Sequence, residues 1–318
     1  MKSISIISPC FNEEDNLELC HAAVAKVFKE KLPEYEYEHI FADNGSTDRT
    51  PELLRELAAK DARVRVIFNS RNFGSFRSMF NALRRSSGDA VIPFLPADLQ
   101  DPPELIAEFV KLWENGYEVV AGARKEREEA FIMHRARSVF YWIANRLADF
   151  EIPEKVGEFQ LIDRKVCNAV LQYKDHYPFL RGMIASVGFR RIIVPYVWTK
   201  RERGKSKFSI FMLMDQAING VFSFTNLPMR LCSLLGFMLS VLCILYTLGI
   251  VIAYAFGLAA APKGTLTLIV SLFFLSGVQI FFIGVLGEYV TSIHRQVCSG
   301  PLVVERELLN FPVEDLAA

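Results

Sequence analysis

The sequence predicts an α/β domain, a mostly parallel sheet with helices on both faces, followed by two long apolar segments. Three observations support this. Apolar runs alternate with helix-like stretches through the first 125 residues, the first four of those runs are each followed by a polar cluster, and the longest uncharged segments lie in the C-terminal third. Such alternation is typical of parallel strands joined by crossover helices.

Five short apolar runs predict the strands. They are SISIIS (3–8), HIFAD (39–43), RVRVIF (63–68), AVIPFL (90–95) and EVVAGA (118–123). Helix-like stretches lie between them near 14–30, 48–60, 75–87 and 102–115. Asp48 or Thr47 is expected to cap the second helix, and Pro51 falls in its first turn.

The polar clusters follow the first four predicted strands. In chain order they are SPCFNEED, DNGSTD, NSRNFG and PADLQD. In open parallel sheets, ligands bind outside the carboxyl ends of the strands. One such loop is an ordinary turn or helix cap, but four that converge on one edge predict a binding site.

The acidic loop, residues 96–101, suits a hard divalent cation. Asp98 and Gln100, two positions apart in an extended loop, can face the same side. Mg²⁺ and Mn²⁺ take oxygen ligands of this kind, so a metal is expected at Asp98. Asp101 is explained at least as well as a helix N-cap before Pro102.

Two apolar segments predict a transmembrane hairpin. Residues 231–262 and 264–287 contain no charged side chain, and each segment exceeds the roughly 20 residues that cross a bilayer as a helix. We expect spans at about 231–257 and 264–287, with both chain ends on one side. A pair of buried core helices is the alternative.

Flanking charges predict an orientation in the inner (plasma) membrane. The N-terminus has no signal-peptide pattern. Basic residues precede the first span and follow the second, whereas the intervening turn offers only Lys263. The catalytic domain and both termini are therefore expected to be cytoplasmic.

The predicted organisation has four parts: a domain over 1–207, a juxtamembrane interface region at 208–230, the spans within 231–290, and a cytoplasmic tail at 291–318. A second interface helix is expected near 134–150. Lys+Arg and Asp+Glu both number 36, so no global charge indicates nucleic acid. Small residues in the spans permit helix association and hence a homo-oligomer.

Five motifs in order resemble glycosyltransferase family 2. They are SPCFNEE, DNGSTDRT, SRNFG, ADLQDPPELI and RERGKSKFS, over about residues 3–210. The polyprenyl-phosphate branch is most similar, including dolichyl-phosphate mannose synthases and bacterial undecaprenyl-phosphate glucosyltransferases. The resemblance implies a GT-A fold.

The resemblance also implies roles for the nucleotide-binding residues. Pro9, Phe11 and Glu13 match the family's P-x-Y-N-E stretch. Together with Asp43 and Asn44, they would hold the base and ribose of the donor.

Further residues match the metal and phosphate positions of the family. Asp98 matches the second aspartate of the D-A-D metal motif, and Gln100 its neighbouring ligand. Arg124 matches an arginine near the phosphates. Arg201 and Lys207 match a basic loop that closes over the donor and acceptor phosphates, although a juxtamembrane cluster attracted to anionic lipid also explains them.

Two positions depart from the family's pattern. Pro96 stands where the motif has its first aspartate, and Glu158 stands where many relatives have an aspartate cast as general base. Glutamate can still accept a proton or orient a group, so Glu158 is a catalytic candidate. Proline offers no side-chain oxygen to a metal or ribose.

The resemblance implies inverting transfer of a sugar from a nucleotide diphosphate sugar to polyprenyl phosphate, with Mg²⁺ or Mn²⁺. UDP-glucose is the first expectation for the donor, and GDP-mannose is the alternative. A processive polysaccharide synthase would usually carry Q-x-x-R-W, which is missing here. A non-catalytic lipid- or nucleotide-binding membrane partner is the remaining alternative.

Overall fold

The computed structural model describes residues 1–125, 156–173, 175, 178–197, parts of 234–256, 264–297 and 300–312. The chain forms two compact units. Unit 1 comprises Met1–Met212 and Gly300–Ala318, and unit 2 comprises Leu213–Ser299.

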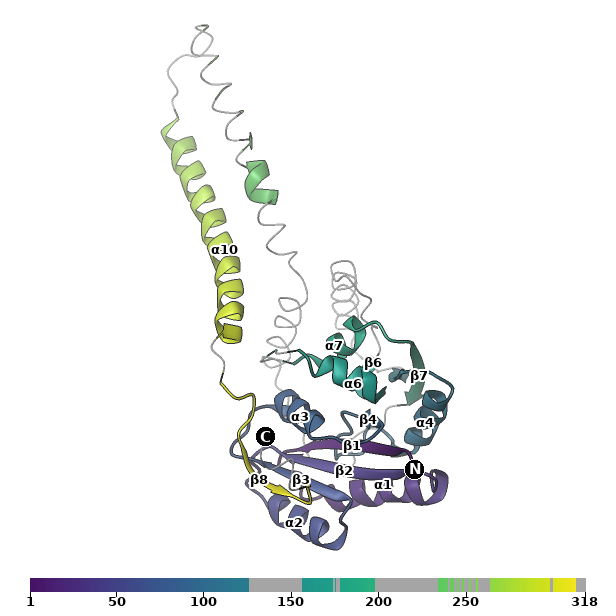
Figure 1. Cartoon of the computed structure of the whole chain (residues 1–318). Helices are drawn as coiled ribbons and strands as arrows, with labels where there is room; N and C mark the ends of the chain where they lie inside the picture. Colours follow the sequence, from purple (N-terminus) through teal and green to yellow (C-terminus); the bar gives the residue numbers. More distant parts are fainter. Residues whose placement is uncertain are drawn as a thin grey trace. The chain divides into compact units, whose positions relative to one another are not determined.

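Unit 1 is built on an eight-stranded sheet of order β7-β5-β6-β4-β1-β2-β3-β8 (Figure 1). The strands are β1 (Ser3–Cys10), β2 (Glu36–Asp43), β3 (Val64–Asn69), β4 (Ala90–Ile92), β5 (Val119–Lys125), β6 (Val156–Asp163), β7 (Arg191–Val197) and β8 (Glu305–Leu309). β1 pairs in parallel with β2 and β4, β2 with β3, and β5 with β7, whereas β6 and β8 pair antiparallel with their neighbours. The predicted mostly parallel sheet is confirmed.

The four helical stretches predicted before residue 116 are all present, whereas the two helices within residues 164–186 were not predicted. The helices are α1 (Leu17–Lys31), α2 (Thr50–Lys60), α3 (Ser75–Arg84), the 3₁₀ turn η1 (Pro103–Leu105), α4 (Ile106–Glu114), α6 (Arg164–Val170), α7 (Leu180–Ser186) and α10 (Thr265–Val297). The N-cap of α2 is Arg49, with no side-chain cap bond, so neither predicted residue caps it; Asp48, one position earlier, accepts a hydrogen bond from the Thr50 backbone N–H at 3.0 Å. β4 is shorter than predicted because Pro93 has no N–H to donate to a sheet ladder.

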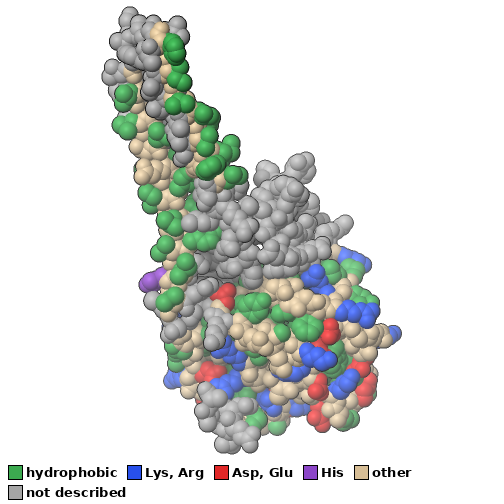
Figure 2. Space-filling model, turned by 45° about the horizontal axis from the view of Figure 1, so that its top comes forward, with side chains coloured by type: hydrophobic (Ala, Val, Ile, Leu, Met, Phe, Trp, Pro, Cys, Tyr) green, Lys and Arg blue, Asp and Glu red, His purple; other side chains and the backbone are tan. Residues whose placement is uncertain are grey.

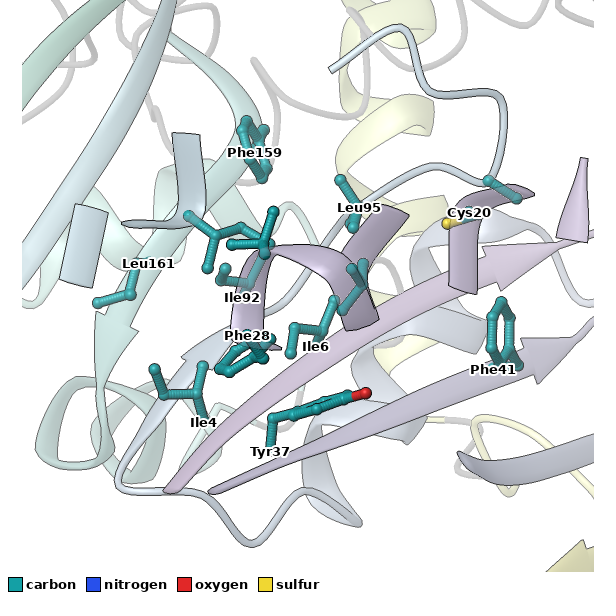
Figure 3. Packing of buried hydrophobic residues seen from close by; sticks show 14 of the residues in the cluster. Ile4, Ile6, Cys20, Phe28, Tyr37, Phe41, Ile92, Leu95, Phe159 and Leu161 are labelled. Atoms are coloured by element: carbon teal, nitrogen blue, oxygen red, sulfur yellow. The ribbon is translucent and has the colours of Figure 1, made fainter. Parts of the chain in front are cut away.

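One apolar core fixes the sheet and its covering helices. Ile4 and Ile6 of β1 and Phe28 of α1 lie in one cluster (Figure 3). The same cluster includes side chains of α2 and α4. α3 contacts β1 and β2 from the opposite face (Figure 1). Because both faces are packed, the strands are rigid and hold the loops at their carboxyl ends in place.

The C-terminal segment returns to the sheet, which the sequence analysis did not anticipate. β8 pairs antiparallel with β3. Arg55 forms an ion pair with Glu307, and Arg85 forms one with Glu305 at 2.9 Å. Both ends of unit 2 therefore connect to unit 1.

Asn310 follows β8 and bonds the C-terminal segment to the sheet domain. Replacing Asn310 is expected to weaken this contact. The φ of Asn310 is +60°, and its Nδ2 donates to the carbonyls of Ala58 at 2.8 Å and Val64 at 2.9 Å. Asn310→Ala should lower the free energy of unfolding by about 1–3 kcal/mol, because two part-buried carbonyls lose a donor and alanine tolerates a positive φ poorly. Chemical unfolding of the purified chain measures this.

Asn310→Gly is the matched control, because glycine adopts the positive φ freely but lacks the amide. It should lose less stability than the alanine variant. A stability of Asn310→Ala equal to that of the wild type would show that the attachment does not depend on this residue.

Unit 2 presents apolar side chains to its surroundings. Figure 2 shows hydrophobic side chains along the visible face of this unit. Exposed examples are Leu235, Phe237, Leu245, Leu272, Phe281 and Ile293. Most of the second predicted span, 264–287, lies in α10, whereas the first, 231–257, is only partly described. Within the described residues, no helix has both the length and the apolar character that crossing a membrane requires.

Candidate functional site

The first two polar loops are joined by hydrogen bonds at the carboxyl edge of the sheet. The Asn12 N–H donates to Ser46 Oγ at 2.8 Å, and Asn12 Oδ1 accepts from the Thr47 N–H at 2.8 Å. The Glu13 N–H donates to Thr50 Oγ1 at 2.9 Å. These bonds fix Glu13 beside the second loop, as the convergence of the loops predicts.

Asp43 ends β2 directly beside the end of β1. Its register partner is Cys10, and Pro9 pairs with Ala42 one position earlier. Asp43 is only 2% exposed and accepts hydrogen bonds from the N–H and hydroxyl of Ser46. Burial raises the pKa of Asp43, and the bonds from Ser46 offset part of that rise. The structure thus brings Pro9, Glu13 and Asp43 to one edge, with half-buried Phe11 following β1.

Asn44 holds the third loop in place. Its Oδ1 accepts from Asn69 Nδ2 at 3.2 Å and from the Phe73 N–H at 2.9 Å, and its Nδ2 donates to Asn72 Oδ1 at 2.8 Å. Gly45 follows at φ +74°, and a Cβ there would lie 2.8 Å from the Arg71 carbonyl carbon. The amide of Asn44 is therefore engaged by protein groups, and a direct contact with nucleotide stays a prediction.

The acidic loop leaves β4 alongside β1. The Leu95 N–H donates to the Ile7 carbonyl at 2.8 Å. Leu99 has φ +56°, and the Gln100 N–H donates to Asp98 Oδ1 at 3.2 Å. This turn keeps Asp98 and Gln100 close together, both partly exposed.

The oxygen donors of this loop fit Mg²⁺ or Mn²⁺. Among the residues that the structure describes, no three His, Cys, Asp or Glu side chains form a metal-binding cluster. Such a cluster is not needed, because these ions commonly take one or two protein ligands and complete their shell with water and substrate phosphate. Asp98 and Gln100 supply ligands of that chemistry.

The charge of Asp98 also acts on a buried thiol of α1. Burial is the main cause that raises the pKa of Cys20 to about 12, and the charges of Asp98 and Glu13 act in the same direction. Burial likewise raises the pKa of Cys10, with Asp43 and Glu13 adding to it. The charges of acidic residues in the first, second and fourth loops therefore disfavour ionisation of these two buried thiols.

Asp101 is not the helix cap that its position suggested. The residue before η1 is Pro102, with no side-chain cap. The Asp101 carboxylate is 1% exposed and lies 3.2 Å from Arg124 Nη2 through each oxygen. It also accepts a hydrogen bond from the Tyr196 hydroxyl. The side chain turns inward because Arg124 and Tyr196 offer stronger partners than a helix end.

Glu158 lies beside the guanidinium group of Arg181. Its side chain is 13% exposed, and Oε1 is 3.9 Å from Arg181 Nε. Burial raises the pKa of Glu158, although the charges of Arg181 and Arg124 oppose that rise. Among the described residues, Oε2 has no hydrogen-bond partner. A buried carboxylate oxygen in this condition is suited to accept a bond from a ligand.

Sequence reasoning missed Arg181 and Tyr196. Arg181 is on α7, where its Nη1 donates to the Val156 carbonyl at 2.8 Å. The sequence feature that could have identified Arg181 is the placement of an arginine within the apolar run FLRGMI. Arg201, Lys207 and the predicted interface segments at 134–150 and 208–230 lie outside the described residues, so their roles stay predictions.

Comparison with known proteins covers both parts of the chain. A family model described as Glycosyl transferase family 2 matches residues 5–171, and one described as GtrB C-terminal hairpin matches residues 227–293. A mannosyltransferase structure from Pyrobaculum calidifontis, in complex with GDP-Man and Mn²⁺, aligns with 63% of this chain and 58% of its own, at 19% identity and TM-score 0.44.

Curated relatives are similar along nearly the whole length. An uncharacterized glycosyltransferase from Synechocystis, sll0501, is 35% identical, covering 98% of each chain. A bactoprenol glucosyl transferase of Shigella phage SfX is 34% identical, covering 94% of this chain and 97% of its own. With the parallel sheet and its converging loops, these matches establish that the chain is a glycosyltransferase of family 2 with a GT-A fold.

Proposed function

We propose that this glycosyltransferase moves a sugar, glucose in the first instance, from a UDP-sugar to polyprenyl phosphate. One observation carries the proposal. The 34% identity with the phage bactoprenol glucosyl transferase extends over 94% of this chain, so it includes the C-terminal hairpin region as well as the sheet domain. An enzyme with a water-soluble acceptor would have no evident use for unit 2.

The donor would bind across the carboxyl edge of the sheet. Carboxylates such as Asp43 accept hydrogen bonds from base or ribose groups. Asp98 and Gln100 would hold the metal, which would neutralise charge on the donor diphosphate when bound. Arg124 has a side chain that is 26% exposed and would add positive charge to the same group.

The acceptor would need little activation. A phosphate monoester has its second ionisation near pH 6, so its oxygen is already anionic at neutral pH. The enzyme must instead hold two anions together and stabilise the departing diphosphate. Glu158 would orient the acceptor or its counter-ions, and Arg181 and the predicted basic loop would supply positive charge. Attack in line with the leaving group would invert the anomeric carbon.

Unit 2 would serve as the membrane anchor. Its exposed apolar side chains suit a lipid surrounding, and both of its ends connect to unit 1. A segment that leaves one domain and returns to it must enter and leave a bilayer on the same side. We infer a hairpin in the inner membrane, with the catalytic unit and both termini cytoplasmic. Such a site would meet a soluble donor and a lipid-dissolved acceptor at their boundary.

Transfer of radiolabelled sugar into undecaprenyl phosphate by the purified protein tests the proposal. The donors are UDP-glucose, UDP-galactose, UDP-N-acetylglucosamine and GDP-mannose, each with Mg²⁺, with Mn²⁺ and with a chelator. Metal-dependent label in the lipid phase from UDP-glucose is expected. Label from GDP-mannose alone would reassign the donor, and nucleotide binding without any transfer would favour a non-catalytic partner.

A further inference from the structure

We propose that Asp101, completed by the Tyr196 hydroxyl, is a positioning residue that holds the Arg124 guanidinium at the carboxyl edge for the donor's diphosphate. This inference rests on the proposed function, since it assigns a task within the same site. Asp101 itself would not touch the donor. It would act through Arg124 and through the loop that carries Asp98.

Strand register places the partners of Asp101 next to each other. Arg124 of β5 and Tyr196 of β7 are direct partners in the parallel pair. Gly122 makes room for the tyrosine ring, because a Cβ there would lie 2.8 Å from Tyr196 Cε1. Tyr196 is buried and packs edge-on against Phe159, with ring centroids 6.0 Å apart. The hydroxyl is thereby held in one place.

The three groups form a closed set of hydrogen bonds. Arg124 Nε donates to the Tyr196 hydroxyl at 3.3 Å, and that hydroxyl donates to Asp101 Oδ1. Arg124 Nη2 completes the set at 3.2 Å from each oxygen of the carboxylate. A planar guanidinium held at two of its nitrogens keeps a fixed orientation.

The Asp101 and Arg124 side chains differ in exposure, and the difference suits binding of an anion by the arginine. The Asp101 side chain is 1% exposed, whereas that of Arg124 is 26% exposed. The carboxylate is therefore committed to protein partners, while the guanidinium extends from them towards solvent. A cation fixed in advance loses little side-chain entropy when it binds an anion.

Asp101 also anchors the acidic loop. Asp98 lies three residues before it, in the turn closed by the Gln100 N–H. Pro102 and Pro103 follow, and η1 begins at Pro103. One buried carboxylate thus fixes the metal-binding loop of β4 relative to the arginine of β5, which are the two elements expected to meet at the diphosphate.

Calorimetric titration of the purified full-length protein with UDP in the presence of Mn²⁺ tests the inference. Asp101→Asn should weaken UDP binding by about 10- to 100-fold, because an amide cannot hold the guanidinium by charge. Tyr196→Phe keeps the buried ring and removes only the hydroxyl, so a smaller loss of about 3- to 10-fold is expected. If Asp101→Asn fails to fold, UDP binding by the Tyr196→Phe variant tests the inference instead.

Asp163→Asn is the matched control. Asp163 ends β6 away from this site, where it accepts from Trp113 Nε1 at 2.8 Å and from the Lys165 N–H at 2.8 Å. If Asp101 is merely structural, both asparagine variants will lower the melting temperature and bind UDP as the wild type does. That result would overturn this inference and leave the proposed function unaffected. If the wild type itself binds no UDP, the donor half of the proposed function fails, and this inference fails with it.

Discussion

Replacing Asp98 with alanine is expected to lower sugar transfer by about 100- to 1,000-fold or more. The acidic loop offers Asp98 and Gln100 as the oxygen ligands, and Gln100 carries no charge to offset a cation. Removing a preorganised electrostatic contact to the leaving group usually costs a factor of this size. The initial rate of label transfer into undecaprenyl phosphate, measured over a range of Mn²⁺ concentrations, gives the loss.

Asp89→Ala controls for general damage to the same strand. Asp89 lies just before β4, at the end opposite the acidic loop, where it accepts a hydrogen bond from the Ser3 N–H at 2.8 Å. Its alanine variant should retain transfer and metal dependence. Both variants should stay folded and extract with the membrane fraction. Full Mn²⁺-dependent transfer by Asp98→Ala would remove this residue from the site.

Glu158→Gln is expected to separate activity from stability. Transfer should fall by about 10- to 1,000-fold, since glutamine keeps the shape but cannot provide a negative charge beside Arg181. The melting temperature at neutral pH should rise, because the protein no longer has to bury a carboxylate. Parallel measurement of transfer rate and thermal unfolding checks both parts.

The effect of Glu158 on the stability of the fold should change with pH in a definite direction. Because burial raises the pKa of Glu158, the folded chain binds this proton more tightly than the unfolded chain does. Glu158 therefore lowers stability progressively as pH rises from the unfolded pKa of about 4.3 through the folded value. The stabilisation by Glu158→Gln should be larger at pH 7 than at pH 4. If Glu158→Gln is less stable than the wild type at pH 7, the attraction between Glu158 and Arg181 stabilises the fold by more than burial of the carboxylate destabilises it.

Much of unit 1 could be predicted from local patterns. Apolar runs such as SISIIS specify strands because a parallel strand inside the sheet is buried on both faces. The rule that loops meet at the carboxyl ends of parallel strands then placed Glu13, Asp43 and Asp98 at one edge before any distance was known. β8 escaped prediction because ERELL is short and charged, and its partner β3 lies more than 200 residues earlier.

The family, the parallel sheet and the edge at which the acidic residues gather can all be derived from the amino-acid sequence. Which polar groups are committed to partners within the protein follows only from the folded structure. It engaged the amide of Asn44 with the third loop, turned Asp101 from a presumed cap towards Arg124 and Tyr196, and set Arg181 beside Glu158. The physical reason is that strand formation depends on neighbours in the chain, whereas the partner of a buried polar group depends on which distant segments pack around it.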